Sequence, residues 1–161
     1  MNAEARAKKM VSYGNAHAAL VDALRQFPRE MWRFKLAPDQ WSIHEIVIHL
    51  SHSEAHSYIR CRTCIAEPGQ AVMAYDENEW AVALCYHDQS MEEALDLIKC
   101  LHLQTYTLIQ SLPDSVWSHT LEHPENGTIS LDDWLDVYER HIPDHIDQMK
   151  GVYAVWRARR W

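Results

Sequence analysis

The segment SLDDWLDVYERHIPDHIDQMKGV, residues 130–152, decides the fold, because its apolar and aromatic residues repeat with the period of an α-helix. The repeating stripe consists of Trp134, Tyr138, His141, His145, Gln148 and Val152. Steps of three and four residues place these side chains on one face of a helix, which must pack against other helices. Ser130 suits a helix N-cap, so the segment predicts a helix from Leu131 to about Arg157.

Three more long helices are predicted upstream of this one. Ser42 followed by Glu45, and Ser90 followed by Glu93, match the capping box that opens helices. The predicted helices span about residues 3–27, 43–67, 91–112 and 131–157, with a short one near 77–84. The segment HPENGT, residues 123–128, has the composition of a turn, and we find no convincing strand. We therefore expect an all-α four-helix bundle forming a single domain over residues 1–161.

The composition excludes several classes of protein. The net charge of −8 disfavours nucleic-acid binding, which requires Lys and Arg to contact phosphates, and the only basic cluster is the C-terminal RARRW. No apolar run approaches the roughly 18 residues that span a membrane, and the N-terminus lacks the apolar part of a signal peptide. We expect a cytoplasmic protein whose four cysteines are thiols. Cys61 and Cys64 form a CxxC, which allows a redox or zinc role, but their helical context favours ordinary thiols.

Two histidines in the last helix are candidate metal ligands. His141 and His145 lie four residues apart, so their imidazoles stack on one face and can converge on one ion. The alternative is that both side chains form hydrogen bonds to groups on a facing helix. Pro143 lies between them on the outward face. It either kinks the helix and tilts His145 toward His141, or it is simply tolerated at an exposed position.

A third ligand is expected from the helix near residues 43–67. On a helical wheel His49 lies at the edge of the inward stripe, whereas His44 and His52 point away from it and His52 is expected in solvent. His56 lies near the side of His49 but further out. Three imidazoles with open coordination positions are typical of catalytic metal sites, and Zn, Ni, Fe and Cu all accept such ligands.

Several ordered segments together resemble the DinB/YfiT-like superfamily of metal-binding four-helix bundles, and most closely its YfiT-like branch. These segments are WSIHEIVIHLSHSEAHSYIR (41–60), AYDENEW (74–80), LEHPENGTISLDDWL (121–135) and YERHIPDHIDQM (138–149). The resemblance implies an up-down-down-up bundle, often a homodimer, with one nickel or zinc ion held by His49, His141 and His145. It also implies hydrolysis or the transfer of a low-molecular-weight thiol such as bacillithiol or mycothiol.

Three further residues are candidate substrate contacts. Arg60 lies on nearly the same side of its helix as His49 and can bind a carboxylate, although a surface salt bridge is the more ordinary role. Tyr75 and Asp76 match the family segment YDE. They are expected either to line the metal cavity, with Asp76 as a base or as an acceptor for a ligand, or to form an acidic loop that caps the short helix.

The preferred interpretation is a metal-dependent enzyme that acts on a small molecule. A divalent metal lowers the pKa of a bound thiol or water and so provides a nucleophile at neutral pH. The sequence identifies no general base and no substrate. The competing interpretation is a non-catalytic metal-binding or stress-response module, in which the ion only stabilises the fold.

Overall fold

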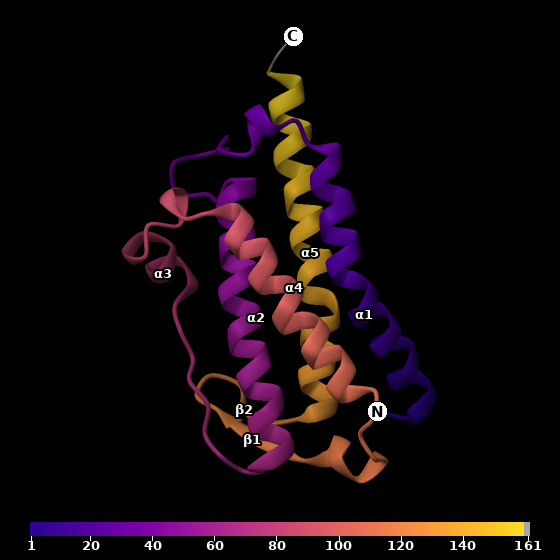
Figure 1. Ribbon diagram of the computed structural model, residues 1–161. Coiled ribbons are helices and arrows are strands. Elements are labelled where there is room, and N and C mark those ends of the chain that lie inside the picture. Colours follow the sequence, from indigo (N-terminus) through magenta and orange to yellow (C-terminus); the bar gives the residue numbers. More distant parts are fainter. Residues whose placement is uncertain (160–161) are drawn as a thin grey trace.

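The computed structural model describes residues 1–159, so the last two residues of the basic C-terminal segment lie outside it. Four long helices form an all-α bundle, as the sequence predicts (Figure 1). The α-helices are α1 (Ala3–Gln26), α2 (Ile43–Ala66), α3 (Glu77–Ala83), α4 (Met91–Ile109) and α5 (Leu131–Ala158). In Figure 1, α1 and α5 run in one direction while α2 and α4 run in the other, which confirms the expected up-down-down-up order. Short 3-10 helices cover Arg29–Met31, Tyr86–Asp88 and Asp114–Ser118.

The packing of the helices brings α2 and α5 side by side. Each of these two helices also contacts another long helix, because α2 packs along α4 and α5 packs along α1. Contact between α1 and α4 closes the bundle around Gly14, where an added Cβ would lie 2.4 Å from the ring of Tyr106. Gly14 therefore leaves room for the ring of Tyr106 between the two helices.

Apolar side chains fill the bundle in two clusters along its length. One cluster contains Leu20, Ile46 and Ile98, all fully buried, and the other contains Leu121 and Trp134. Each such buried side chain contributes roughly 1.5–3 kcal/mol relative to an exposed one.

The buried face of α5 includes Trp134, Tyr138 and Val152 of the predicted stripe, but between them it runs through Ile142, Ile146 and Met149. His141 and His145 lie at its edge, and Gln148, which was expected to face inward, is exposed.

Capping side chains set where the long helices begin. Ser42 and Glu45 form the expected capping box at the start of α2, and Ser130 forms an equivalent one with Asp133 at the start of α5. The hydroxyl of Ser90 accepts a hydrogen bond from the amide of Glu93 at the start of α4. The predicted end of α4 at residue 112 was wrong. The helix ends at Ile109, three residues earlier.

The expectation of no strand was also wrong. A small antiparallel hairpin joins β1 (Thr120–His123) to β2 (Gly127–Ser130), with Leu121 paired to Ile129. Gly127 has φ +68°, a conformation that favours glycine at the end of the turn. The turn itself lies in the predicted HPENGT segment. Four-residue strands are too short to show the alternation by which strands are recognised in a sequence, and β1 is supported by backbone bonds to residues 69–72.

The cysteines and the helix compositions agree with the sequence-based expectations. Cys61 and Cys64 are fully buried free thiols, and burial raises their pKa values to about 12 and about 11. Since the thiolate is the reactive form, neither thiol is suited to redox chemistry or metal binding. Among the described helices, none combines the length and the apolar character required to cross a membrane.

Candidate metal centre

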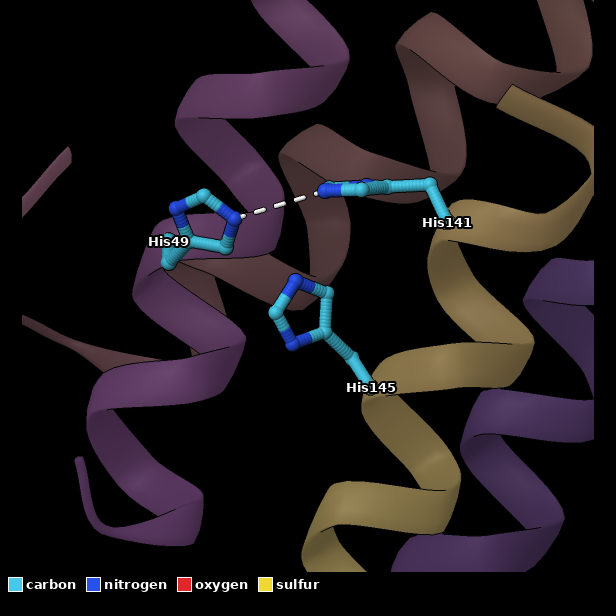
Figure 2. A group of neighbouring side chains, drawn as sticks. All are labelled: His49, His141 and His145. Atoms are coloured by element: carbon cyan, nitrogen blue, oxygen red, sulfur yellow. Dashed lines mark hydrogen bonds between the residues drawn. The ribbon is translucent and has the colours of Figure 1, made fainter. Parts of the chain in front are cut away.

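Three imidazoles meet between α2 and α5. His49 projects from α2, while His141 and His145 project from successive turns of α5 (Figure 2). The Nε2 atoms of His49 and His141 are 3.4 Å apart, and one ring nitrogen from each histidine lies within 4.8 Å of the others. Among residues 1–159, no further His, Cys, Asp or Glu joins this group. The structure thus brings together the three histidines that the sequence singles out.

The start of α2 fixes the position of His49. The Ser42–Glu45 capping box is held from outside by Lys35, whose Nζ lies 3.1 Å from the Glu45 carboxylate. Trp41 is the residue before the cap. Its ring centroid lies 4.7 Å from that of His49 and 6.5 Å from that of His145. A rigid helix start and an aromatic wall therefore hold two of the three imidazoles.

All three imidazoles are neutral at pH 7. Burial, together with the neighbouring His145 and His141, lowers the pKa of His49 to about 2. Burial also lowers the pKa of His141 to about 3. The pKa of His145 is lowered by burial as well, although its hydrogen bond to Gln148 acts in the opposite direction. Each ring therefore keeps one nitrogen lone pair, which is the form that binds metals.

The outer ring nitrogens determine which lone pairs face inward. Nδ1 of His145 lies 2.8 Å from Oε1 of Gln148, and because a carbonyl oxygen only accepts, Nδ1 carries the proton. Nδ1 of His141 lies 3.5 Å from the hydroxyl of Ser53. Nδ1 of His49 is buried and has no partner among the described residues. Metal-binding histidines commonly donate their second N–H in this way, leaving Nε2 free for the ion.

The spacing of the nitrogens fits a small divalent ion. Two nitrogens at the usual Zn–N distance of about 2.0–2.1 Å are about 3.4 Å apart when the geometry is tetrahedral. The Nε2 atoms of His49 and His141 have this separation. The third nitrogen lies within the same 4.8 Å group, so a modest rotation of the His145 ring completes the set. The residues present therefore fit a metal ion.

Two other histidines of α2 are less exposed than their position on the outer face suggests. His44 was expected to point away from the core but is only 5% exposed, and its amide donates to the carbonyl of Trp32. His52 was expected in solvent but is half-buried, with Nδ1 2.7 Å from the hydroxyl of Tyr86. The expected exposure was wrong because a helical wheel considers one helix alone, whereas the segment around Tyr86 covers the outer face of α2.

Two of the candidate substrate contacts lie close to this centre but already have neighbours. Arg60 donates to the Tyr138 hydroxyl at 2.9 Å and to the Met73 carbonyl at 2.6 Å. It forms no ion pair with any described residue, so the expected surface salt bridge is not found. The ring of Tyr75 stacks on His56 at 4.2 Å, and its hydroxyl is buried without a hydrogen-bond partner. Burial raises the pKa of this hydroxyl, which therefore remains protonated.

Asp76 and Pro143 have mainly structural surroundings. Asp76 is exposed and accepts hydrogen bonds from the amides of Asn78 and Glu79, so it caps α3, which is one of the two roles expected for it. Pro143 lies inside α5, which continues through it from Leu131 to Ala158. The proline has no N–H, so the Glu139 carbonyl one turn earlier lacks its usual helical donor.

Two cavities flank α3 beside this centre. One of about 480 Å³ includes His145 and Gln148 in its wall together with residues of α3 and the Trp41 segment. The other, of about 380 Å³, lies against α2 and is lined by His52, His56, Arg60, Trp80 and neighbouring residues. Only the larger cavity contains one of the three clustered histidines, so it provides the approach to them.

Comparison with known proteins identifies the family. The sequence pattern of the DinB superfamily matches residues 13–149. The chain belongs to the DinB superfamily. The relatives of this DinB chain include OB0782 of Oceanobacillus iheyensis, which carries the name "Putative metal-dependent hydrolase" and is 32% identical over 112 residues. YfiT of Bacillus subtilis carries the same name and is 29% identical over 107 residues.

These DinB relatives are longer than the matching segment. The matches cover 70% and 66% of this chain but only 64% and 60% of OB0782 and YfiT, so under two thirds of each relative is spanned. The solved structure of YfiT from Bacillus subtilis superposes with a TM-score of 0.86 at 24% identity, covering 94% of this chain and 87% of YfiT. A mycothiol-dependent maleylpyruvate isomerase superposes with a TM-score of 0.71 at 8% identity, covering 88% and 59%. Both likenesses concern the fold of the bundle.

Two residues that touch the histidines in this DinB chain were given no role from the sequence. Gln148 was recognised only as part of the inward stripe, yet it binds His145 from one turn further along α5. Ser53 follows His49 by one turn of α2 and reaches His141 on the facing helix. Polar residues one turn after a candidate ligand are the signal that would have found both.

Proposed function

We propose that this protein is a metal-dependent enzyme in which His49, His141 and His145 hold one divalent transition-metal ion, either Zn or Ni. Its reaction is either the transfer of a low-molecular-weight thiol to an electrophile or the hydrolysis of a small molecule. Two comparisons favour this class. The relatives are named as metal-dependent hydrolases, and one protein of similar fold is a mycothiol-dependent isomerase.

The observation that carries the proposal is the convergence of three neutral imidazoles whose inner nitrogens face one another. The Nε2 atoms of His49 and His141 lie 3.4 Å apart, and Gln148 fixes the proton of His145 on its outer nitrogen. Buried lone pairs that face one another are unfavourable without a proton or a cation between them. A shared cation removes that cost and uses all three groups at once.

The ion and the protein contribute different functions to this mechanism. The ion, once bound, supplies a positive charge that lowers the pKa of a thiol or water in contact with it. His49, His141 and His145 would hold the ion, and the ring of Trp41 packs against the rings of His49 and His145. The cavity beside His145 leaves room for the reactant. No residue is assigned as general base.

The remaining predicted site residues contribute to substrate binding in this proposal. Arg60 lines the smaller cavity and donates to the Tyr138 hydroxyl. Its buried Nε has no partner among the described residues and can donate to a part of the reactant that reaches this cavity. The buried hydroxyl of Tyr75 stays protonated and is also a donor. Asp76 acts more indirectly, because its cap holds the first turn of α3 at the edge of the larger cavity. We also propose that the protein is cytoplasmic and forms a homodimer. Sedimentation of the purified protein tests the homodimer.

A non-catalytic metal-binding module is the alternative. Such a module needs a closed site, usually with four protein ligands. Among residues 1–159 the group contains three ligands and adjoins a cavity, which favours the enzyme.

The test is to purify the protein without a His tag and to measure bound metals by mass spectrometry. We expect close to one Zn or Ni per chain, at least tenfold less in His141→Ala, and no loss in His87→Ala, a control at an exposed histidine. Conjugation of cysteine to 1-chloro-2,4-dinitrobenzene and hydrolysis of 4-nitrophenyl acetate then report the two reaction classes. Equal and negligible metal in the wild type and in His141→Ala would rule out the proposal.

A further inference from the structure

The chemistry of the larger cavity indicates what kind of molecule reaches the histidines. This cavity, of about 480 Å³, is large enough for a small reactant, and its wall combines a proposed metal ligand, His145 of α5, with polar groups from two other segments. The polar and aromatic groups in its wall are Asp39, Gln40, Trp41, Glu77, Asn78 and Gln148. The three-histidine cluster and the cavity share His145, so a molecule in this cavity lies beside the proposed ion.

The charge of this lining is negative, and the lining contains no Lys or Arg that would neutralise it. Asp39 and Glu77 form no hydrogen bond or ion pair through their carboxylates with the described residues. Burial raises the pKa of Glu77 and the negative charges of Asp76 and Glu125 raise it further, while Arg60, outside this lining, acts in the opposite direction. On α5, Lys150 already pairs with Asp147 at 2.7 Å. A reactant that enters here therefore meets two unpaired carboxylates.

The smaller cavity offers the opposite charge. It is lined by Arg60 and by apolar side chains that include Ile59 and Met73, and none of the three clustered histidines belongs to it. A carboxylate-bearing reactant has a favourable partner there but not beside His145. The two cavities therefore make opposite demands on a ligand, although α3 contributes residues to both.

We propose that the cavity beside His145 selects a reactant that carries a positively charged amine, and that Asp39 and Glu77 provide this selectivity. The carboxylates and the amide oxygens of the wall accept N–H hydrogen bonds, and the ring of Trp41 provides a face for a cation. The inference rests on the proposed function, because it concerns the reactant that approaches the metal. For thiol transfer, it specifies an aminothiol rather than an acidic thiol.

The size of the effect follows from the exposure of the two carboxylates. Asp39 and Glu77 are both solvent-exposed, so salt and water weaken their attraction for an amine. At low ionic strength two such charges change the relative affinity of a cationic and an anionic ligand by about tenfold, and 0.5 M salt removes most of that difference.

The test uses the protein loaded with Co²⁺ and three simple thiols that differ in charge. Cysteamine is cationic, 2-mercaptoethanol is neutral and 3-mercaptopropionate is anionic, and each is titrated while the thiolate-to-cobalt absorption band is recorded. Because the thiols also differ in acidity, the informative quantity is the cysteamine to 3-mercaptopropionate affinity ratio, compared between variants. The variants are Asp39→Asn combined with Glu77→Gln, and the control is Glu79→Gln, an exposed α3 residue outside the cavity wall.

We expect the affinity ratio to fall about tenfold in the double variant, to stay unchanged in Glu79→Gln, and to shrink in high salt. An unchanged ratio in the double variant, or no thiolate band with any of the three thiols, overturns the inference. These results are distinct from failure of the proposed function, because Co²⁺ binding is measured first and on its own. If the protein binds no Co²⁺, both proposals fail at that step.

Discussion

His102 and His49 are both fully buried in the bundle, yet the surroundings of their imidazoles differ. Nε2 of His102 donates to the backbone carbonyl of Tyr13 at 2.7 Å, and its Nδ1 lies 3.3 Å from the carboxylate of Glu54. Around His49, by contrast, the nearest partner of Nε2 is another imidazole, and Nδ1 has none. The protein thus supplies both partners for one histidine and neither a carboxylate nor a carbonyl for the other.

This difference separates a structural histidine from a candidate ligand. A carbonyl can only accept, so Nε2 of His102 carries a proton, and Nδ1 of the same ring faces the carboxylate of Glu54. Both ring nitrogens of His102 therefore have partners within the protein. The cluster of His49, His141 and His145 contains three neutral bases and no acid that could supply a proton. A cation from outside completes that cluster.

The largest expected effect is the stabilisation of the wild-type protein by zinc. Zinc at about 1,000 times its dissociation constant should raise the free energy of unfolding by about 4 kcal/mol, since the ion binds the folded chain preferentially. His141→Ala should lose this increment entirely. His102→Gln should lower the stability of the metal-free protein but keep the full zinc increment. Urea titrations with and without zinc measure both quantities, and a zinc increment that also disappears in His102→Gln would remove the distinction between the two regions.

Removing the acid of the structural pair should cost somewhat less. Glu54 and His102 are 1% and 0% exposed, so Glu54→Ala leaves a buried imidazole nitrogen without a partner. Breaking a buried pair by removing one member costs about 3 kcal/mol or more, and we expect a loss of about 3 kcal/mol in the free energy of unfolding. The measurement is urea denaturation of the metal-free protein, together with the metal content of the folded variant. We expect the metal content to stay at the wild-type level, because Glu54 does not belong to the three-histidine group.

The metal-free protein should also lose stability as the pH falls below about 6.5. The folded-state pKa values of His49 and His141 are lowered to about 2 and about 3. Below pH 6.5 these histidines take up protons in the unfolded chain but stay neutral in the folded protein. The free energy of unfolding therefore falls with decreasing pH until the folded pKa values are reached. Between pH 6.5 and 5 each ring contributes a loss of about 2 kcal/mol.

A variant isolates the contribution of one ring to this pH dependence. His141→Leu fills a similar volume without a titratable group, so its stability curve in the presence of EDTA should be flatter by about 2 kcal/mol over that pH interval. Denaturation at a series of pH values measures the two curves. Parallel curves for the wild type and His141→Leu would show that the ring of His141 is not held neutral in the fold.

Much of the bundle and the three-histidine cluster was predictable from the sequence, because both depend on helical periodicity. Helical spacing places His141 and His145 together at the edge of the buried face of α5, and the wheel of α2 places His49 at the edge of its own inward stripe. These are properties of single helices, which repeat at a known angle. The hairpin of β1 and β2 was not predictable in the same way, since each strand has only four residues and depends on pairing with residues 69–72.

The environment of the cluster required tertiary information. The sequence indicates that His52 lies on the outer face of α2, but not that Tyr86 would cover it. Likewise Arg60 has the spacing for a role near His49, but its bonds to Tyr138 and the Met73 carbonyl depend on how a loop crosses α2. Helix faces are local features, whereas the contacts that orient side chains on them come from distant segments.

The smallest expected effects concern the two residues that hold the outer nitrogens of the α5 histidines. Gln148 lies 2.8 Å from Nδ1 of His145, so Gln148→Leu should weaken metal binding about tenfold, as removal of an orienting partner does at other sites. Ser53 lies 3.5 Å from Nδ1 of His141, at the limit of a hydrogen bond, so Ser53→Ala should weaken it only about threefold. Competition with a fluorescent zinc chelator measures both dissociation constants. A larger loss of metal affinity for Ser53→Ala than for Gln148→Leu would contradict this order. It would mean that the contact between Ser53 and His141 shortens when the ion binds, and that the orientation of His141, not of His145, limits the affinity.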